Sequence, residues 1–283
     1  MKTLVTGISG QLGYDIGKEL ERRGLSYLGV NTLNMDLIDH NKIKEVISSY
    51  HPDIIIHCAA YTDVDKAEKE PELCHSVNTE GTRQIAMACS AIDAKLVYIS
   101  TDYVFDGQKE SPYDIGDEPH PLNVYGKSKM EGELEVKKYL AKYFIVRTSW
   151  AFGIHGHNFV KSILQAARTR EKLNVVNDQI GSPTYTKDLA ALLCDMVVTD
   201  HYGIYHATNE GCCSRAEFAD EIIKMAGLGT KIKKVTSAEF PSAACRPHNS
   251  CLSKDSLERC GFHRLRNWKE ALREYIDVLM EGK

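Results

Sequence analysis

The chain has 283 residues, of which 43% are hydrophobic and 26% charged, and its formal net charge at pH 7 is −4. This apolar fraction excludes a disordered or collagen-like protein, and the length allows one large domain or two modest ones. Without a cluster of basic residues, we expect no nucleic-acid partner. No run approaches about 18 consecutive apolar residues, which excludes a membrane-spanning helix, and the lack of a secretory signal favours a cytoplasmic protein.

The nine cysteines form no CxxC pattern. Three of them, Cys245, Cys251 and Cys260, lie near His248 and His263, but their spacing matches no known metal motif. We therefore expect free thiols in a reducing compartment, several of them buried, and no bound metal.

The first half of the chain alternates strand and helix signals. The predicted strands are 2–6, 26–30, 53–58, 95–100 and 143–148. The predicted helices are 11–23, 39–50, 72–92 and 124–139. Strands separated by helices at this spacing predict an α/β fold with a Rossmann-type, doubly wound parallel sheet.

After residue 148 the rhythm becomes irregular. Strands are predicted at 173–176 and 203–207, and helices at 158–170, 186–198, 214–225 and 267–280. We expect residues 1–148 and 173–199 to form the dinucleotide-binding Rossmann domain. Residues 149–172 and 200–283 would then form a smaller, discontinuous α+β lobe for the substrate.

A glycine-rich segment, TGISGQLG at residues 6–13, joins the first strand to the first helix. Its spacing, GxxGxxG, gives a tight turn, a backbone that can approach a pyrophosphate, and close packing of the helix on the strand. The helix N-terminus adds free N–H groups and a partial positive charge. The second strand ends at Asn31 without the usual acidic residue and without a nearby Arg or Lys, so the choice between NADH and NADPH stays open.

Tyr125 and Lys129 stand four residues apart in a predicted helix and therefore share one face. A tyrosine with an ordinary pKa near 10 exchanges protons poorly at neutral pH. We expect the neighbouring ammonium to favour the phenolate and to lower the pKa of Tyr125. The pair alone is weak evidence, because such spacing is common on solvated helices.

Polar residues follow the predicted strand 95–100, in the segment STDYVFDG at residues 100–107. The carboxyl ends of parallel strands form the active-site crevice of doubly wound sheets. A hydroxyl from Thr101 could hydrogen-bond a substrate carbonyl there, with Asp102 beside it. Together with the glycine segment and the Tyr–Lys pair, this arrangement favours a role for Thr101 and Asp102 in carbonyl reduction over a purely structural role in capping a turn.

These motifs resemble the extended short-chain dehydrogenase/reductases and, among them, the dTDP-4-dehydrorhamnose reductase family. The glycine segment and YxxxK mark only the superfamily. The more specific matches are CAAYTDVDKAE (58–68), STDYVFDG (100–107), PLNVYGKSKMEGE (121–133), RTSWAFG (147–153), VVNDQIGSPTYTKDLA (175–190) and RPHNSCL (246–252).

The resemblance implies the reduction of the C4 keto group of dTDP-4-dehydro-β-L-rhamnose to dTDP-β-L-rhamnose, with NADPH or NADH. It implies that Tyr125 protonates the carbonyl oxygen, that Lys129 tunes Tyr125 and holds the nicotinamide ribose, and that Thr101 bonds the same oxygen. The implied substrate contacts are Thr101, Asp102, Trp150, Asn158 and Arg246. The implied cofactor contacts, besides Tyr125 and Lys129, are Gly7, Gly10, Gln11, Leu12, Gly13, Asp36, Leu37, Ala59, Ala60 and Thr62.

Two alternatives remain open at this point. One is another nucleotide-sugar 4-ketoreductase or an epimerase. The other is a non-catalytic regulatory subunit resembling the β subunit of methionine adenosyltransferase. The sequence leaves the nucleotide base and the sugar open, and it allows a homodimer.

Overall fold

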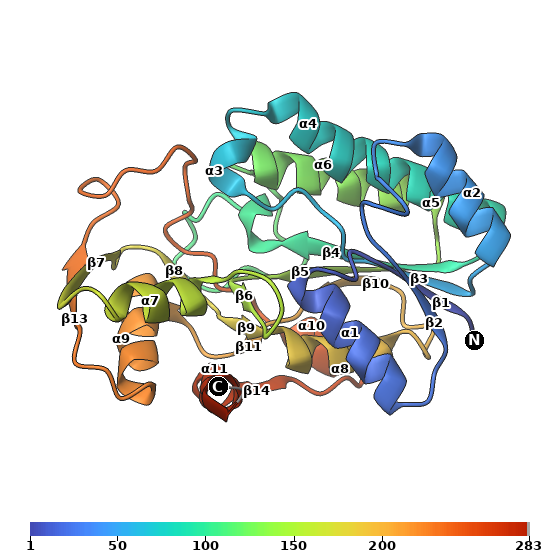
Figure 1. Ribbon diagram of the computed structural model, residues 1–283. Helices are drawn as coiled ribbons and strands as arrows, with labels where there is room; N and C mark the ends of the chain where they lie inside the picture. The colour runs from blue at the N-terminus through green and yellow to red at the C-terminus, as the bar shows by residue number, and fades with distance from the viewer. Residues whose placement is uncertain (282–283) are drawn as a thin grey trace.

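A six-stranded parallel sheet forms the centre of the computed structural model, which describes residues 1–281 (Figure 1). Its strand order is β10-β5-β4-β3-β1-β2, and every neighbouring pair is parallel. The doubly wound α/β prediction is therefore confirmed. Within residues 1–281 no helix is long and apolar enough to cross a bilayer. The sheet strands are β1 (Thr3–Thr6), β2 (Tyr27–Val30), β3 (Ile54–His57), β4 (Lys95–Thr101), β5 (Tyr143–Thr148) and β10 (Gly203–His206).

Helices cover both faces of this sheet (Figure 1). The apolar side chains of β1, β3 and β4 alternate between two buried clusters, so that Val5 and Ile56 join one cluster while Leu4 and Ile55 join the other. One face carries α2 (His40–Tyr50), α3 (Val64–Ala67), α4 (Pro71–His75), the π-helical turn η1 (Ser76–Glu80), α5 (Gly81–Ala91) and α6 (Val124–Tyr139). The other carries α1 (Gln11–Arg22), α8 (Thr186–Met196) and α10 (Asp255–Arg259).

A smaller lobe lies at one end of the sheet and has its own apolar core (Figure 1). Its centre includes Phe152, Phe218 and Trp268. The lobe contains α7 (Phe159–Ala167), α9 (Arg215–Met225), α11 (Trp268–Glu281), and β7 (Lys172–Val176) paired with β13 (Lys231–Val235). Short strands complete the described chain: β6 (Ala151–Phe152), β8 (Ile180–Gly181), β9 (Thr184–Tyr185), β11 (Asn209–Glu210), β12 (Cys213–Ser214) and β14 (Leu265–Asn267).

Two strands pair with partners that lie across the expected boundary between the two domains. β7, which we expected in the Rossmann domain, pairs with β13, whereas β10, which we expected in the substrate lobe, is an edge strand of the main sheet beside β5. Periodicity identifies a short strand but carries no information about its partner, so the sequence could not place either one. We propose that the Rossmann unit comprises residues 1–148 together with α8 and β10, and that β7 belongs to the lobe.

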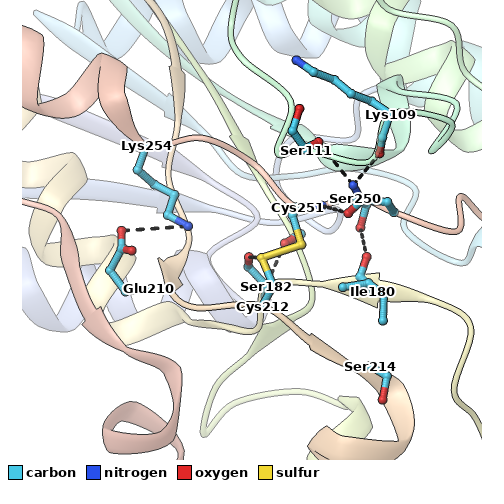
Figure 2. The surroundings of a disulfide bond; sticks show 12 residues. Lys109, Ser111, Ile180, Ser182, Glu210, Cys212, Ser214, Ser250, Cys251 and Lys254 are labelled. Atoms are coloured by element: carbon cyan, nitrogen blue, oxygen red, sulfur yellow. Dashed lines mark hydrogen bonds and ion pairs between the residues drawn. A yellow bond between two sulfur atoms is a disulfide. The ribbon is translucent and has the colours of Figure 1, made fainter.

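Cys212 and Cys251 form a disulfide, although we expected free thiols throughout (Figure 2). Their Cα atoms are 6.3 Å apart, and 39 positions separate them in the sequence. The bond ties the turn before α9 to the segment 246–252 in the lobe. Ser182 lies against it, with its hydroxyl oxygen 3.3 Å from the sulfur of Cys212. The other seven cysteines are free thiols.

Candidate active site

A cavity of about 770 Å³ lies where the strand order changes direction, between β1 and β3. Such switch points are where doubly wound sheets bind ligands, at the carboxyl ends of their strands. Residues that follow β1, β3, β4 and β5 line the cavity, and residues of α1, α6, α8 and α9 and the segment before α7 complete it. The sheet and the lobe therefore both contribute to one site.

Two glycines of the glycine segment, Gly7 and Gly13, have no room for a side chain. Gly7 has a φ of +68°, and a Cβ atom there would lie 2.7 Å from the backbone nitrogen of Ala59. A Cβ on Gly13 would collide with the carbonyl oxygen of Gly7, and the Gly10 N–H donates to that same oxygen at 2.9 Å. Gly10 caps α1 without a side-chain hydrogen bond, so the first turn keeps N–H groups for an anion. This cradle fits the pyrophosphate of a dinucleotide.

The loop after β2 forms the next part of the cavity wall. Asn31, Thr32, Asp36 and Leu37 line it there. Within residues 1–281, the lysine and arginine side chains that line the cavity, Lys129 and Arg215, come instead from α6 and α9. A 2′-phosphate on the cofactor therefore meets no cation from this loop, and the structure adds no reason for a strict preference for NADPH.

The loop after β3 is held by buried polar side chains. The Ala59 N–H donates to the hydroxyl of Thr6 at 3.1 Å. Asn78, in the π-helical turn, accepts from the Tyr61 N–H at 2.8 Å and donates to the hydroxyl of Ser128 at 2.9 Å. Asn78 thus fixes this loop against α6, the helix that carries the Tyr–Lys pair. No motif marks Asn78 in the sequence, and the π-turn that contains it interrupts the helix predicted at 72–92.

The last residue of β4 and the two that follow it form a compact polar corner. The Thr101 hydroxyl accepts from the Tyr103 N–H at 3.2 Å and donates to Asp102 Oδ1 at 3.0 Å. Asp102 is buried, and its second carboxylate oxygen has no hydrogen-bond partner in residues 1–281. Burial raises the pKa of Asp102 to about 6, despite the hydroxyl groups of Ser250 and Thr101, which favour the carboxylate.

The electrostatics of the Tyr–Lys pair differ from our expectation. Burial raises the pKa of Tyr125, and the Asp102 carboxylate raises it further. Burial also lowers the pKa of Lys129 to about 7, so this side chain carries only part of its positive charge at neutral pH. Desolvation therefore outweighs the attraction between ammonium and phenolate in this structure. Lys129 lies with its nitrogen 4.0 Å from the centre of the Tyr98 ring.

A buried ion pair anchors α6 to the sheet. Arg147 on β5 donates to both carboxylate oxygens of Glu133, at 2.8 and 2.7 Å, and Ser100 donates to the same carboxylate at 2.6 Å. The side chains of Arg147 and Glu133 are 2% and 1% exposed. Two-pronged pairing of this kind fixes orientation as well as distance. Glu133 is one turn beyond Lys129, so the pair sets the position of the Tyr–Lys face.

The lobe contributes Trp150 and Arg215. Trp150 has a φ of +46°, an uncommon conformation for a bulky residue that is typical of functional sites. The guanidinium of Arg215 lies 3.6 Å from the centre of the Trp150 ring and 5.3 Å from that of Phe159. Sequence reasoning identified the helix that begins at Arg215 but not this arginine, because it belongs to no motif.

Two expected substrate residues are engaged within the protein. Asn158 lines the cavity, and its amide donates to Gln11 Oε1 and to the Tyr275 hydroxyl, both at 3.0 Å. It thereby joins α7 to the glycine segment. Arg246 is not among the lining residues, and its guanidinium forms an ion pair with Asp65 at 2.7 Å.

The cavity brings together all of the other predicted site residues. The predicted site residues that line the cavity are Gly7, Gly10, Gln11, Leu12, Gly13, Asp36, Leu37, Ala59, Ala60, Thr62, Thr101, Asp102, Tyr125, Lys129, Trp150 and Asn158.

No group of three or more His, Cys, Asp or Glu side chains suited to a metal occurs within residues 1–281.

The fold and the cavity define a Rossmann-type nucleotide-binding protein with a reductase-like Thr–Tyr–Lys set. Comparison with known proteins identifies the family: the model of the RmlD substrate binding domain matches residues 1–281, and the chain belongs to that family. It is 42% identical to the spore coat polysaccharide biosynthesis protein SpsK of Bacillus subtilis, over 97% of this chain and 96% of that protein.

Solved structures agree with this assignment. The chain resembles a dTDP-4-dehydrorhamnose reductase from Clostridium acetobutylicum with a TM-score of 0.97 and 40% identity, covering 99% of this chain and 100% of that one. It resembles the Bacillus anthracis dTDP-4-dehydrorhamnose reductase, solved in complex with NADP, with a TM-score of 0.96 and 42% identity, covering 98% and 99%. The resemblance noted from the motifs is thus confirmed over the whole length.

Proposed function

We propose that this protein is a dTDP-4-dehydrorhamnose reductase, which reduces the C4 keto group of dTDP-4-dehydro-β-L-rhamnose to give dTDP-β-L-rhamnose. One observation carries the proposal: a single cavity contains both the glycine cradle for a dinucleotide and the Thr101–Tyr125–Lys129 set. Full-length similarity to proteins with that name supports the substrate.

Each polar group in the cavity has a distinct task in this reaction. Bound NADPH or NADH supplies the hydride. Tyr125 donates a proton to the C4 oxygen, while the Thr101 hydroxyl holds the same oxygen. Lys129 binds the nicotinamide ribose, and Trp150 packs beside the sugar. The raised pKa of Tyr125 keeps this side chain protonated, as a proton donor must be, but it also makes Tyr125 a weaker acid than a tyrosine in water. Transfer of its proton therefore depends on the basicity of the alkoxide that forms at C4.

We also propose a cytoplasmic location, where the nucleotide substrate and cofactor are made, and we retain the homodimer as a prediction. The net charge of −4 supports the absence of a nucleic-acid partner. A regulatory role without turnover would not need the complete Thr–Tyr–Lys set.

A turnover assay with several nucleotide-linked 4-keto-sugars tests the proposal. We expect oxidation of NADPH or NADH that depends on the dTDP-linked keto-sugar. Tyr125→Phe removes only the proton donor, so kcat should fall by about 100-fold or more while NADPH affinity changes less than about twofold. Tyr139→Phe, at the far end of α6, is the matched control.

Two outcomes would contradict this assignment. Full activity of Tyr125→Phe would exclude Tyr125 as the proton donor. Isomerisation of the sugar without net consumption of NAD(P)H would indicate an epimerase instead.

A further inference from the structure

Arg215 is an arginine of the cavity that neither the family motifs nor the reduction step explains. It is the first residue of α9, which begins with a capping box formed by Ser214 and Glu217. This cap fixes the backbone from which the side chain extends into the cavity. A side chain in such a position is held in one place within the cavity and does not extend freely into solvent.

The guanidinium is pre-oriented by its aromatic neighbours. It stacks on the Trp150 ring at 3.6 Å, a geometry that holds the planar group while leaving its N–H donors at the edge. The side chain of Tyr103 interacts with it as well. Little rotational freedom is left for a ligand to remove, which favours tight binding.

Arg215 differs from three other arginines in having no close ion pair, although the Asp102 carboxylate acts on it at longer range. Arg246, Arg147 and Arg266 each form a close ion pair with a carboxylate, at 2.7, 2.7 and 2.9 Å. Arg215 forms no such pair within residues 1–281. An arginine held in a cavity without a carboxylate partner is suited to bind an anionic group of a ligand.

The nucleotide-sugar proposed above has a neutral base and a neutral sugar, so its only negative charges are on the diphosphate. The cofactor's pyrophosphate has the glycine cradle after β1, whereas Arg215 comes from the lobe, next to Trp150 and near Asp102. Resting on the function proposed above, we infer that Arg215 binds the sugar-proximal phosphate of the nucleotide-sugar and so selects nucleoside diphosphate sugars over sugars that lack this group.

Binding measurements with dTDP and dTMP test this inference without turnover. These ligands differ only in the second phosphate. Arg215→Met should weaken dTDP binding by about 10- to 100-fold, the effect of losing a charge-assisted hydrogen bond, and should change dTMP binding by less than about twofold. Arg215→Lys keeps a point charge but loses the planar fork, so its loss should be intermediate.

Controls separate this role from a structural one. Arg273→Met, at an exposed position of α11, should leave both affinities unchanged. NADPH affinity and the thermal midpoint should be the same in all variants. Equal losses for dTDP and dTMP, or no loss for dTDP, would overturn the inference. Failure of the unmodified protein to bind dTDP would instead contradict the proposed function.

Discussion

Substitution of Asp102 by Asn should stabilise the protein in a pH-dependent way. The carboxyl is buried, one of its oxygens has no partner in the described chain, and its pKa in the folded protein is about 6, against an ordinary value of 3.8. A raised pKa means that the folded state holds the proton more tightly than the unfolded state. Ionisation therefore lowers the free energy of unfolding as the pH rises from 3.8 through 6.

The magnitude follows from the two pKa values. Their difference corresponds to about 3 kcal/mol once the pH is above 6, and about half of this is already present at pH 5. Asn cannot ionise, so the stability gained by Asp102→Asn should grow by about 1.3 kcal/mol between pH 5 and pH 7 and then level off.

Urea denaturation of the cofactor-free protein at several pH values between 5 and 8 measures this difference. The change of this stability difference with pH is the diagnostic quantity. Any constant difference in stability between the protonated acid and the amide is the same at every pH and cancels. Asp277→Asn, at an exposed site on α11, controls for the loss of one negative charge. A gain that is independent of pH, or one that shrinks as the pH rises, would refute the reasoning.

Two further predictions concern the anchor of α6 and the choice of cofactor. Glu133→Gln leaves the buried guanidinium of Arg147 without its counter-charge, so the free energy of unfolding should fall by about 3–5 kcal/mol in urea denaturation, and a loss under 1 kcal/mol would contradict it. Because the loop with Asn31 and Thr32 offers no cation to a 2′-phosphate, kcat/KM for NADPH and NADH should agree within about tenfold, and a preference above about 100-fold would show that a cation does reach that phosphate.

Local patterns in the sequence predicted the elements of the sheet well. The predicted helix 124–139 and strand 143–148 coincide with α6 and β5, because each combines a clear periodicity with clear ends. Pairing was harder to predict. Nothing in a strand of four or five residues specifies its neighbour, so the pairing of β10 with β5 and of β7 with β13 could not be predicted.

The residues of the site were likewise predictable only where local sequence reveals their neighbours. Residues in contiguous motifs, such as Gly7 and Tyr125, could be predicted because their neighbours in the chain reveal their environment. Arg215 and Asn78 could not, since both act through tertiary packing. Arg215 stacks on an aromatic ring of another segment, and Asn78, in a π-turn, supports the loop beside the cavity. The partner of Cys212 was equally hidden, 39 residues away.

The position of the substrate lobe depends on contacts outside the reductase motif. Asn158, which caps α7, donates a hydrogen bond to Gln11 in the glycine segment, and so links the lobe directly to the turn that cradles the dinucleotide. Trp150 and Arg215 are held over the cavity by the aromatic core of the same lobe. In the proposed function the Tyr–Lys pair performs the chemistry, and the lobe would select the molecule that is presented to it. If this holds, exchanging Arg215 or Trp150 should change the affinity for the nucleotide-sugar more than the affinity for NADPH.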